Sequence, residues 1–253
     1  MSGKECLEIS DDYKYDPKTY TKGNQVKYFK DNYFYKLDMH GHEGYVETLV
    51  SKLLSFMKLD DRLDYVTYNE CIVNGTNACK SLNFLKHDEQ VVSMSRLYRM
   101  LGNKGELSDK LFGLPDAKTR LDYLVDIVSK FGIYGDIFKI YLNTLFQLDI
   151  LVKNSDRHMH NICYIVNSKR EWRPAPIFDN GHSLDTDFKN ETTSCSISGV
   201  FEEQLLAFSF PYQPVITFDN NEVSKFIHSL PRTHEVIVLS ERLEKYGYLF
   251  KKE

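Results

Sequence analysis

The 253-residue sequence has few cysteines, and their spacing forms no motif. The five cysteines are scattered, odd in number and nowhere arranged as a C-x-x-C pair. They are Cys6, Cys71, Cys79, Cys163 and Cys195. This argues against a disulfide framework, which secreted proteins build from an even number of cysteines at regular spacings. We therefore predict reduced thiols and a cytoplasmic protein.

Long hydrophobic runs are also missing. Although 42% of the residues are hydrophobic, no run approaches the length needed to span a membrane. Residues 1–6 lead into acidic, tyrosine-rich sequence rather than into the apolar segment of a signal peptide. We expect one soluble globular unit with two lobes and no membrane partner. Secretion would require a route that uses no signal peptide.

An excess of positive charge is missing as well. The chain has 32 Lys and Arg residues against 36 Asp and Glu residues, a formal net charge of −4. Proteins that bind nucleic acid usually carry a basic surface. The composition therefore argues against direct nucleic-acid binding.

The pattern of the chain changes near residue 88. Before it, the periodicity predicts strands at 26–30, 33–38, 64–73 and 79–85, and an amphipathic helix at 43–59. After it, the prediction is mainly helical, at 90–101, 117–131, 134–152, 220–230 and 232–247. We predict an α+β fold with a small β-rich N-lobe at 1–88 and a larger helical C-lobe at 89–253.

The most specific motif is N-S-D-R-H-M-H-N at residues 154–161. Asp156 and Asn161 have the spacing of a protein-kinase catalytic loop, in which the carboxylate receives the substrate hydroxyl and the amide holds magnesium. Residues 134–152 just before it are apolar on most sides, so the loop should extend from a buried, rigid helix.

A second motif, D-N-G, begins at Asp179. The residues between Asn161 and Asp179 read as strand, turn, strand, and a hairpin brings its two ends together. One carboxylate and one amide oxygen suit magnesium better than thiols or imidazoles do. The sequence predicts Asn161 and Asp179 as magnesium ligands and Asp156 as the catalytic carboxylate.

Weaker signals in the N-terminal part fit a nucleotide site. Gly23-Asn24-Gln25 precedes a strand pair, and backbone amides of such a loop can approach phosphates. Lys36 could reach the α- and β-phosphates from its strand, oriented by Glu43 or Glu47 on the next helix. A favourable position in the helix dipole explains either glutamate equally well. Backbone groups near Phe84, at the lobe connection, would contact adenine.

Other functions fit some of the same residues. Asp156, His158 and His160 form D-x-H-x-H, which could bind zinc in a metal-dependent phosphohydrolase, although only His182 is a further candidate ligand nearby. A nucleotide-binding pseudokinase that acts through a partner is the other alternative. In the kinase interpretation, His158 braces the loop by a hydrogen bond, and Arg157 and His160 face solvent or substrate.

Several motifs together carry a resemblance to a known family. They are G-N-Q-V-K, Y-K-L-D, E-G-Y-V-E, N-S-D-R-H-M-H-N and P-I-F-D-N-G. From about residue 20 to about residue 230, the chain resembles the HipA-like Ser/Thr kinases, particularly the short stand-alone members related to the cell-translocating kinase CtkA. The resemblance implies a bilobal kinase fold distantly related to phosphoinositide kinases, ATP and Mg²⁺ as cofactors, and a protein substrate with a Ser or Thr acceptor.

The resemblance also implies roles for single residues. Asp156 would be the catalytic aspartate, Asn161 and Asp179 the magnesium ligands, Lys36 the phosphate-contacting lysine, and Gly23-Asn24-Gln25 the phosphate loop. In the kinase interpretation, the Ser- and Thr-rich residues 185–200 would form an activation segment that could autophosphorylate, although an ordinary polar loop explains their composition equally well. The chain looks too short for the extra amino-terminal subdomain of full-length HipA toxins, so an antitoxin-type partner does not follow.

Overall fold

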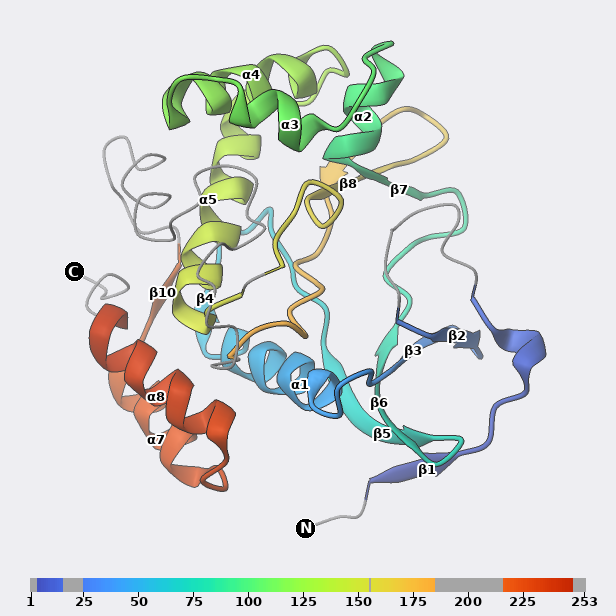
Figure 1. Cartoon of the computed structure of the whole chain (residues 1–253), viewed down its shortest axis with the longest axis vertical. Helices are drawn as coiled ribbons and strands as arrows, with labels where there is room; N and C mark the ends of the chain where they lie inside the picture. Colours follow the sequence, from blue (N-terminus) through green and yellow to red (C-terminus); the bar gives the residue numbers. More distant parts are fainter. Residues whose placement is uncertain (1–3, 16–24, 155, 185–215, 248–253) are drawn as a thin grey trace.

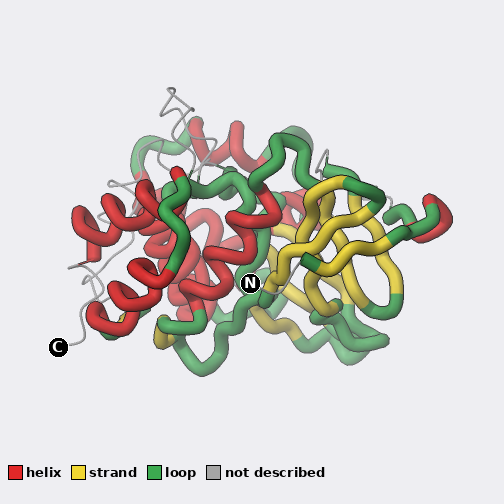
Figure 2. The backbone as a smooth tube through the Cα atoms, turned by 90° about the horizontal axis from the view of Figure 1, so that it is seen from below, coloured by secondary structure: helices red, strands yellow, loops and turns green. Residues whose placement is uncertain are grey.

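A sheet with one helix comes first along the chain, and a set of helices with a smaller sheet follows (Figure 1). The computed structural model describes residues 4–15, 25–154, 156–184 and 216–247. The predicted α+β class is confirmed, and Figure 2 shows most strands on one side and most helices on the other. Within the described ranges, no helix combines the length and apolar character that crossing a bilayer requires.

The larger sheet has five strands in the order β1-β5-β6-β3-β2. They are β1 (Glu5–Leu7), β2 (Lys27–Lys30), β3 (Tyr33–Leu37), β5 (Tyr68–Val73) and β6 (Thr76–Leu82). β1 joins β5 in parallel, and the other neighbours are antiparallel. Asp31 and Asn32 form the β2–β3 turn with φ of 51° and 65°, the left-handed conformation of two-residue hairpin loops. This turn places Lys27 opposite Lys36.

The N-terminal segment is tied to both edges of this sheet. β1 covers the β5 edge, and the Asn74 side chain accepts from the Ile9 amide at 2.8 Å and donates to the Ile9 carbonyl at 2.9 Å. After the short 3₁₀ helix η1 (Asp11–Tyr13), the Tyr15 amide donates to the Lys27 carbonyl at 2.8 Å. Tyr15 is thereby held beside β2.

α1 (Glu43–Leu54) is shorter than the predicted helix at 43–59. Its end is set by tertiary pairing, because β4 (Met57–Lys58) joins β10 (Thr217–Phe218) in a small antiparallel sheet. The apolar face of α1 is buried as predicted, at Val46, Leu49, Val50, Leu53 and Leu54.

α1 packs closely on β6 through Gly44. A Cβ at this position would lie 2.8 Å from the Ala78 carbonyl carbon and 2.8 Å from Asp38 Oδ1. The Gly44 amide donates to the same Asp38 oxygen at 2.7 Å. The close approach therefore depends on glycine at this position.

The helical part contains α2 (Met94–Met100), α3 (Leu107–Phe112), α4 (Ala117–Ser129), α5 (Gly135–Val152), α7 (Asn220–Ser229) and α8 (His234–Tyr246). α5 is buried along most of its length and occupies the centre, as predicted (Figure 1). α1 shares one hydrophobic cluster with these helices. The division at residue 88 therefore stays a prediction, since one core extends across it.

A three-stranded sheet supports the predicted catalytic loop. It contains β7 (Gln90–Ser93), β8 (Cys163–Val166) and β9 (Trp172–Pro174), in that order. β8 and β9 form the predicted hairpin. The helix predicted to start at residue 90 is wrong in its first turn, because residues 90–93 pair with β8. The helix begins only after Ser93, whose hydroxyl accepts from the Arg96 amide.

Candidate active site

The loop carrying Asp156 is attached to the end of α5. Lys153 ends the helix in the left-handed conformation, with φ of 51°. The next residue, Asn154, is fully buried and donates from its side chain to Asp149 Oδ1 at 3.1 Å. Its Oδ1 accepts from the Asp156 amide at 3.0 Å. The Asp156 backbone is therefore fixed to α5, while its side chain keeps 41% of its surface exposed.

The same loop fixes Asn161. The Asn161 amide donates to the His158 carbonyl at 2.9 Å, and its side-chain nitrogen donates to the Asp156 carbonyl at 3.0 Å. The residue is 3% exposed. Because Nδ2 is used within the loop, Oδ1 is the atom oriented to act as a ligand.

Arg157 is fully buried, so the expectation that it faces solvent or substrate is wrong. Its guanidinium donates to Asp149 through Nε and Nη2, to the Phe178 carbonyl through Nη1 at 2.9 Å, and to Asn180 Oδ1 through Nη2 at 2.7 Å. A buried cation requires such partners. Burial raises the pKa of Asp149, and Arg157 opposes that change.

Lys36 lies between two carboxylates. Its Nζ is 2.6 Å from Glu47 Oε1 and 2.6 Å from Asp179 Oδ1. Burial works to lower the pKa of Lys36, but these neighbours outweigh it and hold the pKa well above its ordinary value. Burial would raise the pKa of Asp179, yet Lys36, Lys27 and Arg157 hold it well below its usual range. Both groups therefore stay charged at neutral pH.

Glu43 and Glu47 have different roles, which the sequence left open. Glu47 pairs with Lys36, and its other oxygen accepts from the Asn180 amide at 3.0 Å. Glu43 instead accepts backbone N–H groups from residues 39–42 at 2.9 to 3.3 Å. It stabilises the loop before α1 rather than Lys36.

An apolar cavity of about 180 Å³ lies beside Lys36. Phe84 is part of its wall and stacks on Phe178, with ring centroids 6.0 Å apart. Tyr15 and Phe34 form another part of the wall, in edge-to-face contact at 5.3 Å. Aromatic walls of this kind suit a planar base.

A polar cavity of about 300 Å³ lies on the other side of the site. Its lining includes Asp156, Asp179, Glu47 and Gln25. Lys27 lines both cavities, and sequence reasoning gave it no role. Of the predicted phosphate loop, Gln25 lies at this cavity, whereas Gly23 and Asn24 fall outside the described residues, as does the predicted activation segment at 185–200.

The histidines do not form the alternative zinc site in the described part of the chain. His158 Nε2 is 4.0 Å from Asp156 Oδ1, and His160 Nε2 lies near Glu106 Oε2 at 3.7 Å. Among the described residues, no three His, Cys, Asp or Glu side chains are grouped to hold a metal ion. His158 Nδ1 is buried and has no hydrogen-bond partner among the described residues. The predicted hydrogen bond by which His158 braces the loop is therefore not made through Nδ1.

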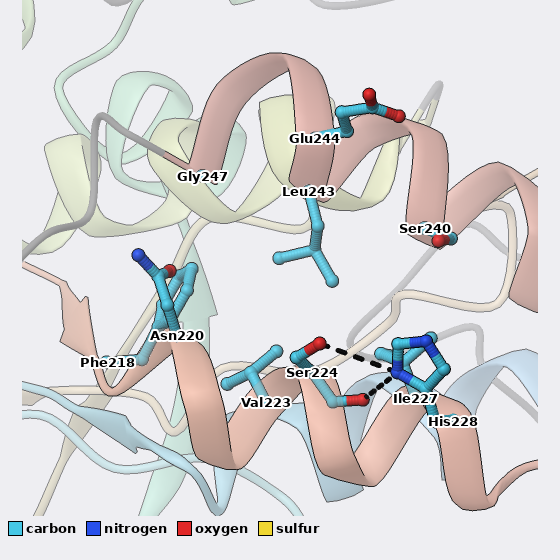
Figure 3. Close-up of a pocket in the computed structure, with 10 residues that line it drawn as sticks. All are labelled: Phe218, Asn220, Val223, Ser224, Ile227, His228, Ser240, Leu243, Glu244 and Gly247. Atoms are coloured by element: carbon cyan, nitrogen blue, oxygen red, sulfur yellow. Dashed lines mark hydrogen bonds between the residues drawn. The ribbon is translucent and has the colours of Figure 1, made fainter.

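A third cavity of about 350 Å³ lies apart from these residues, between α7 and α8 (Figure 3). Phe218, Val223 and Leu243 form its apolar part, and the His228 ring is held by the Ser224 carbonyl at 2.7 Å. No predicted site residue lines it.

The donors present are chemically suited to a nucleotide bound with magnesium. Asp179 and Asn161 offer carboxylate and amide oxygens, the ligands that magnesium prefers. Lys36 and Lys27 offer positive charge between an apolar cavity and a polar one. A nucleotide needs an apolar site for its base, followed by positive charge and a polar site for its phosphates.

Comparisons with known proteins address the fold. No family model matches the sequence, and no curated protein sequence matches it. The proinflammatory kinase CtkA from Helicobacter pylori has a similar structure, with a TM-score of 0.60 and 17% identity over 89% of this chain and 92% of CtkA. HipA of Shewanella oneidensis MR-1, solved with HipB and operator DNA, has a TM-score of 0.53 and 14% identity over 98% of this chain and 67% of HipA. The chain thus has the kinase-like fold shared by CtkA and HipA.

Proposed function

We propose that this protein is an ATP- and Mg²⁺-dependent Ser/Thr protein kinase of the HipA type. The observation that carries the proposal is the position of Lys36, whose ammonium contacts both Glu47 and Asp179. Kinases need this lysine–glutamate pair and this metal-binding aspartate in place together. The fold shared with CtkA, itself described as a kinase, supports the same conclusion.

The two cavities bind different parts of the nucleotide. The base enters the apolar cavity beside Phe84 and Phe178, where stacking and apolar burial hold it. The phosphates extend past Lys36 and Lys27 toward the polar cavity. Lys36 neutralises the non-reacting phosphates, and Glu47 keeps its ammonium oriented.

The catalytic groups act at the polar cavity. Asp156 orients the acceptor hydroxyl and takes its proton, and the partial exposure of its side chain suits a group that must meet a protein substrate. Asp179, which lines this cavity, and Asn161, in the same loop as Asp156, would hold magnesium, which would neutralise charge on the phosphoryl group. The Asn154 hydrogen bond fixes the Asp156 backbone before substrate arrives.

The partner we propose is a protein with a Ser or Thr acceptor, and the proposal places the enzyme in the cytoplasm. It includes neither direct nucleic-acid binding nor an antitoxin-type partner. A nucleotide-binding pseudokinase is a less favoured alternative, because the Lys36–Glu47 pair and the side chains of Asp156, Asn161 and Asp179 are all present. The zinc-dependent phosphohydrolase lacks a grouped ligand set in the described residues.

A phosphoryl-transfer assay tests the proposal. The purified chain is incubated with γ-labelled ATP and Mg²⁺, with and without a mixed protein substrate, beside Asp156→Asn and Asp179→Asn. We expect label on Ser or Thr with the native chain and a loss of about 10²-fold or more in each variant. Thermal denaturation of each variant shows whether it is folded.

The other outcomes distinguish the alternatives. Binding of an ATP analogue without transfer to any protein would indicate a pseudokinase. Metal-stimulated release of free phosphate from simple esters would indicate a phosphohydrolase. Equal labelling by the native chain and Asp156→Asn would exclude Asp156 as the catalytic group.

A further inference from the structure

We propose that Arg157 is a positioning residue. It holds the turn at residues 178–181, called here the Asp179 turn, against the catalytic loop at residues 154–161, and through this turn it also positions Lys36. The inference rests on the proposed kinase function. Arg157 lies between Asp156 and Asn161 in the sequence, yet its side chain is fully buried and does not line the polar cavity that Asp156 lines. We therefore infer that Arg157 positions neighbouring residues and does not contact the substrate itself.

Arg157 contacts the residues on both sides of Asp179. One terminal nitrogen donates to the Phe178 carbonyl at 2.9 Å, and the other donates to Asn180 Oδ1 at 2.7 Å. Asp179 itself has φ of 63°, a left-handed conformation that costs free energy unless its surroundings impose it. The first contact holds the backbone before Asp179, and the second holds the side chain of the residue after it.

The contacts continue from Asn180 to the phosphate-binding lysine. The Asn180 amide donates to Glu47 Oε2 at 3.0 Å, and Glu47 Oε1 accepts from Lys36 Nζ at 2.6 Å. Lys36 Nζ also donates to Asp179 Oδ1, which closes the chain of contacts. A change in the position of Asn180 is thereby transmitted to Glu47 and Lys36.

α1 is packed directly against this turn. A Cβ at Gly181 would lie 3.3 Å from Glu43 Cβ and 3.5 Å from Glu47 Cγ. The turn therefore lies close to α1, with room for a glycine but little for a larger residue. Arg157 contacts the turn through Phe178 and Asn180, so the turn is held from two directions.

The geometry distinguishes positioning from simple charge pairing. Asp149 alone would neutralise the charge of Arg157, and it accepts from Nε and Nη2. The remaining donors reach the Asp179 turn only because the guanidinium is a rigid planar fork. A lysine at this position could neutralise Asp149 but could not also span both neighbours of Asp179.

The test compares Arg157→Lys and Asn180→Ala with the native chain. Calorimetry measures the affinity for a non-hydrolysable ATP analogue with and without Mg²⁺, and amide hydrogen exchange of residues 178–181 is followed in the ligand-free protein. We expect the Mg²⁺-dependent part of the affinity to fall about 10- to 100-fold, as for other residues that orient metal ligands. We also expect exchange in this turn to become faster.

A matched control separates positioning from general destabilisation. Ile227→Val changes a buried residue of α7, outside both cavities of the site, and should leave the Mg²⁺-dependent affinity and the exchange of residues 178–181 unchanged. The double variant Asp149→Asn with Arg157→Met removes the ion pair without leaving a buried unpaired charge, and it keeps an oxygen that can accept from Asn154. It should remain folded and show the same two defects.

The outcomes are distinguishable from failure of the proposed function. If the native chain binds no nucleotide, the kinase proposal fails, while hydrogen exchange of residues 178–181 still tests Arg157. Unchanged exchange and unchanged Mg²⁺-dependent affinity in Arg157→Lys would overturn the positioning role. A fall in thermal stability alone, equal to that of Ile227→Val, would also overturn it.

Discussion

Lys27 lies directly opposite Lys36 across the β2–β3 pair, so two lysine side chains share the face of the sheet that borders both cavities. Opposing like charges destabilise a strand pair unless other groups compensate. Burial lowers the pKa of Lys27, as does repulsion from Lys36, while Asp179 and Glu47 act in the opposite direction. A bound phosphate chain would add the missing negative charge.

Replacing Lys27 should weaken nucleotide binding and stabilise the free protein. In Lys27→Met, the loss of one charge-assisted contact, about 1.5–3 kcal/mol, corresponds to an affinity for ATP about 10- to 150-fold lower. The folded-state pKa of Lys27 lies below its unfolded value, so protonated Lys27 opposes folding at neutral pH. The melting temperature without ligand should therefore rise. Calorimetry and thermal denaturation measure the two effects, and unchanged ATP affinity would contradict the role.

The same lysine should make ATP affinity depend on pH. Phosphate binding favours the charged form of Lys27, so the affinity should fall as pH rises through the lowered pKa of this residue, below the range where an ordinary lysine titrates. Lys27→Arg keeps its charge throughout and should remove this decrease. Titrations of both proteins between pH 7 and about pH 10 compare the two; identical profiles would assign the decrease to another group.

Glu47 and Glu43 offer a matched pair of substitutions on one helix. Glu47→Gln weakens the hold on Lys36, so kcat/KM should fall about 10- to 100-fold. Stability should fall as well, because the new amide group would face either Lys36 or the Asn180 N–H. Glu43→Gln places an amide donor among the N–H groups of residues 39–42 and should mainly lower stability. Steady-state kinetics beside thermal denaturation separates the two. Equal kinetic losses would show that the distinction is wrong.

Gly44 allows α1 to approach the sheet. Gly44→Ala would place a Cβ 2.8 Å from backbone and side-chain atoms and should lower the free energy of unfolding by about 1–3 kcal/mol. Gly113→Ala is the control, because its nearest neighbour would lie at 3.5 Å and its φ is −73°. Urea denaturation measures both variants. A Gly44→Ala protein as stable as Gly113→Ala would show that α1 can shift without cost.

The sequence predicted the elements whose signals are local. α5 follows from a long apolar segment, and the β8–β9 hairpin follows from two short strands around a polar turn. The position of Lys27 could also have been predicted. The two-residue turn at Asp31-Asn32 fixes the register, and counting back from it places residue 27 opposite residue 36.

Other features depend on distant parts of the chain. The burial of Arg157 requires Phe178 and Asn180, which only the folded hairpin brings near. Residues 90–93 form a strand because β8 offers an edge, which no local pattern indicates. Glu43 and Glu47 occupy the same face of one helix, so periodicity could not decide which of them meets Lys36.

The attachment of the N-terminal segment matters for experiments on this protein. The Asn74 side chain makes two hydrogen bonds to the Ile9 backbone. Six residues later, Tyr15 lines the cavity proposed for the base. Because β1 and Ile9 anchor this segment, a change that releases it from the β5 edge would disturb that wall and alter the Michaelis constant for ATP. Kinetic comparisons should therefore use protein that retains this anchored segment.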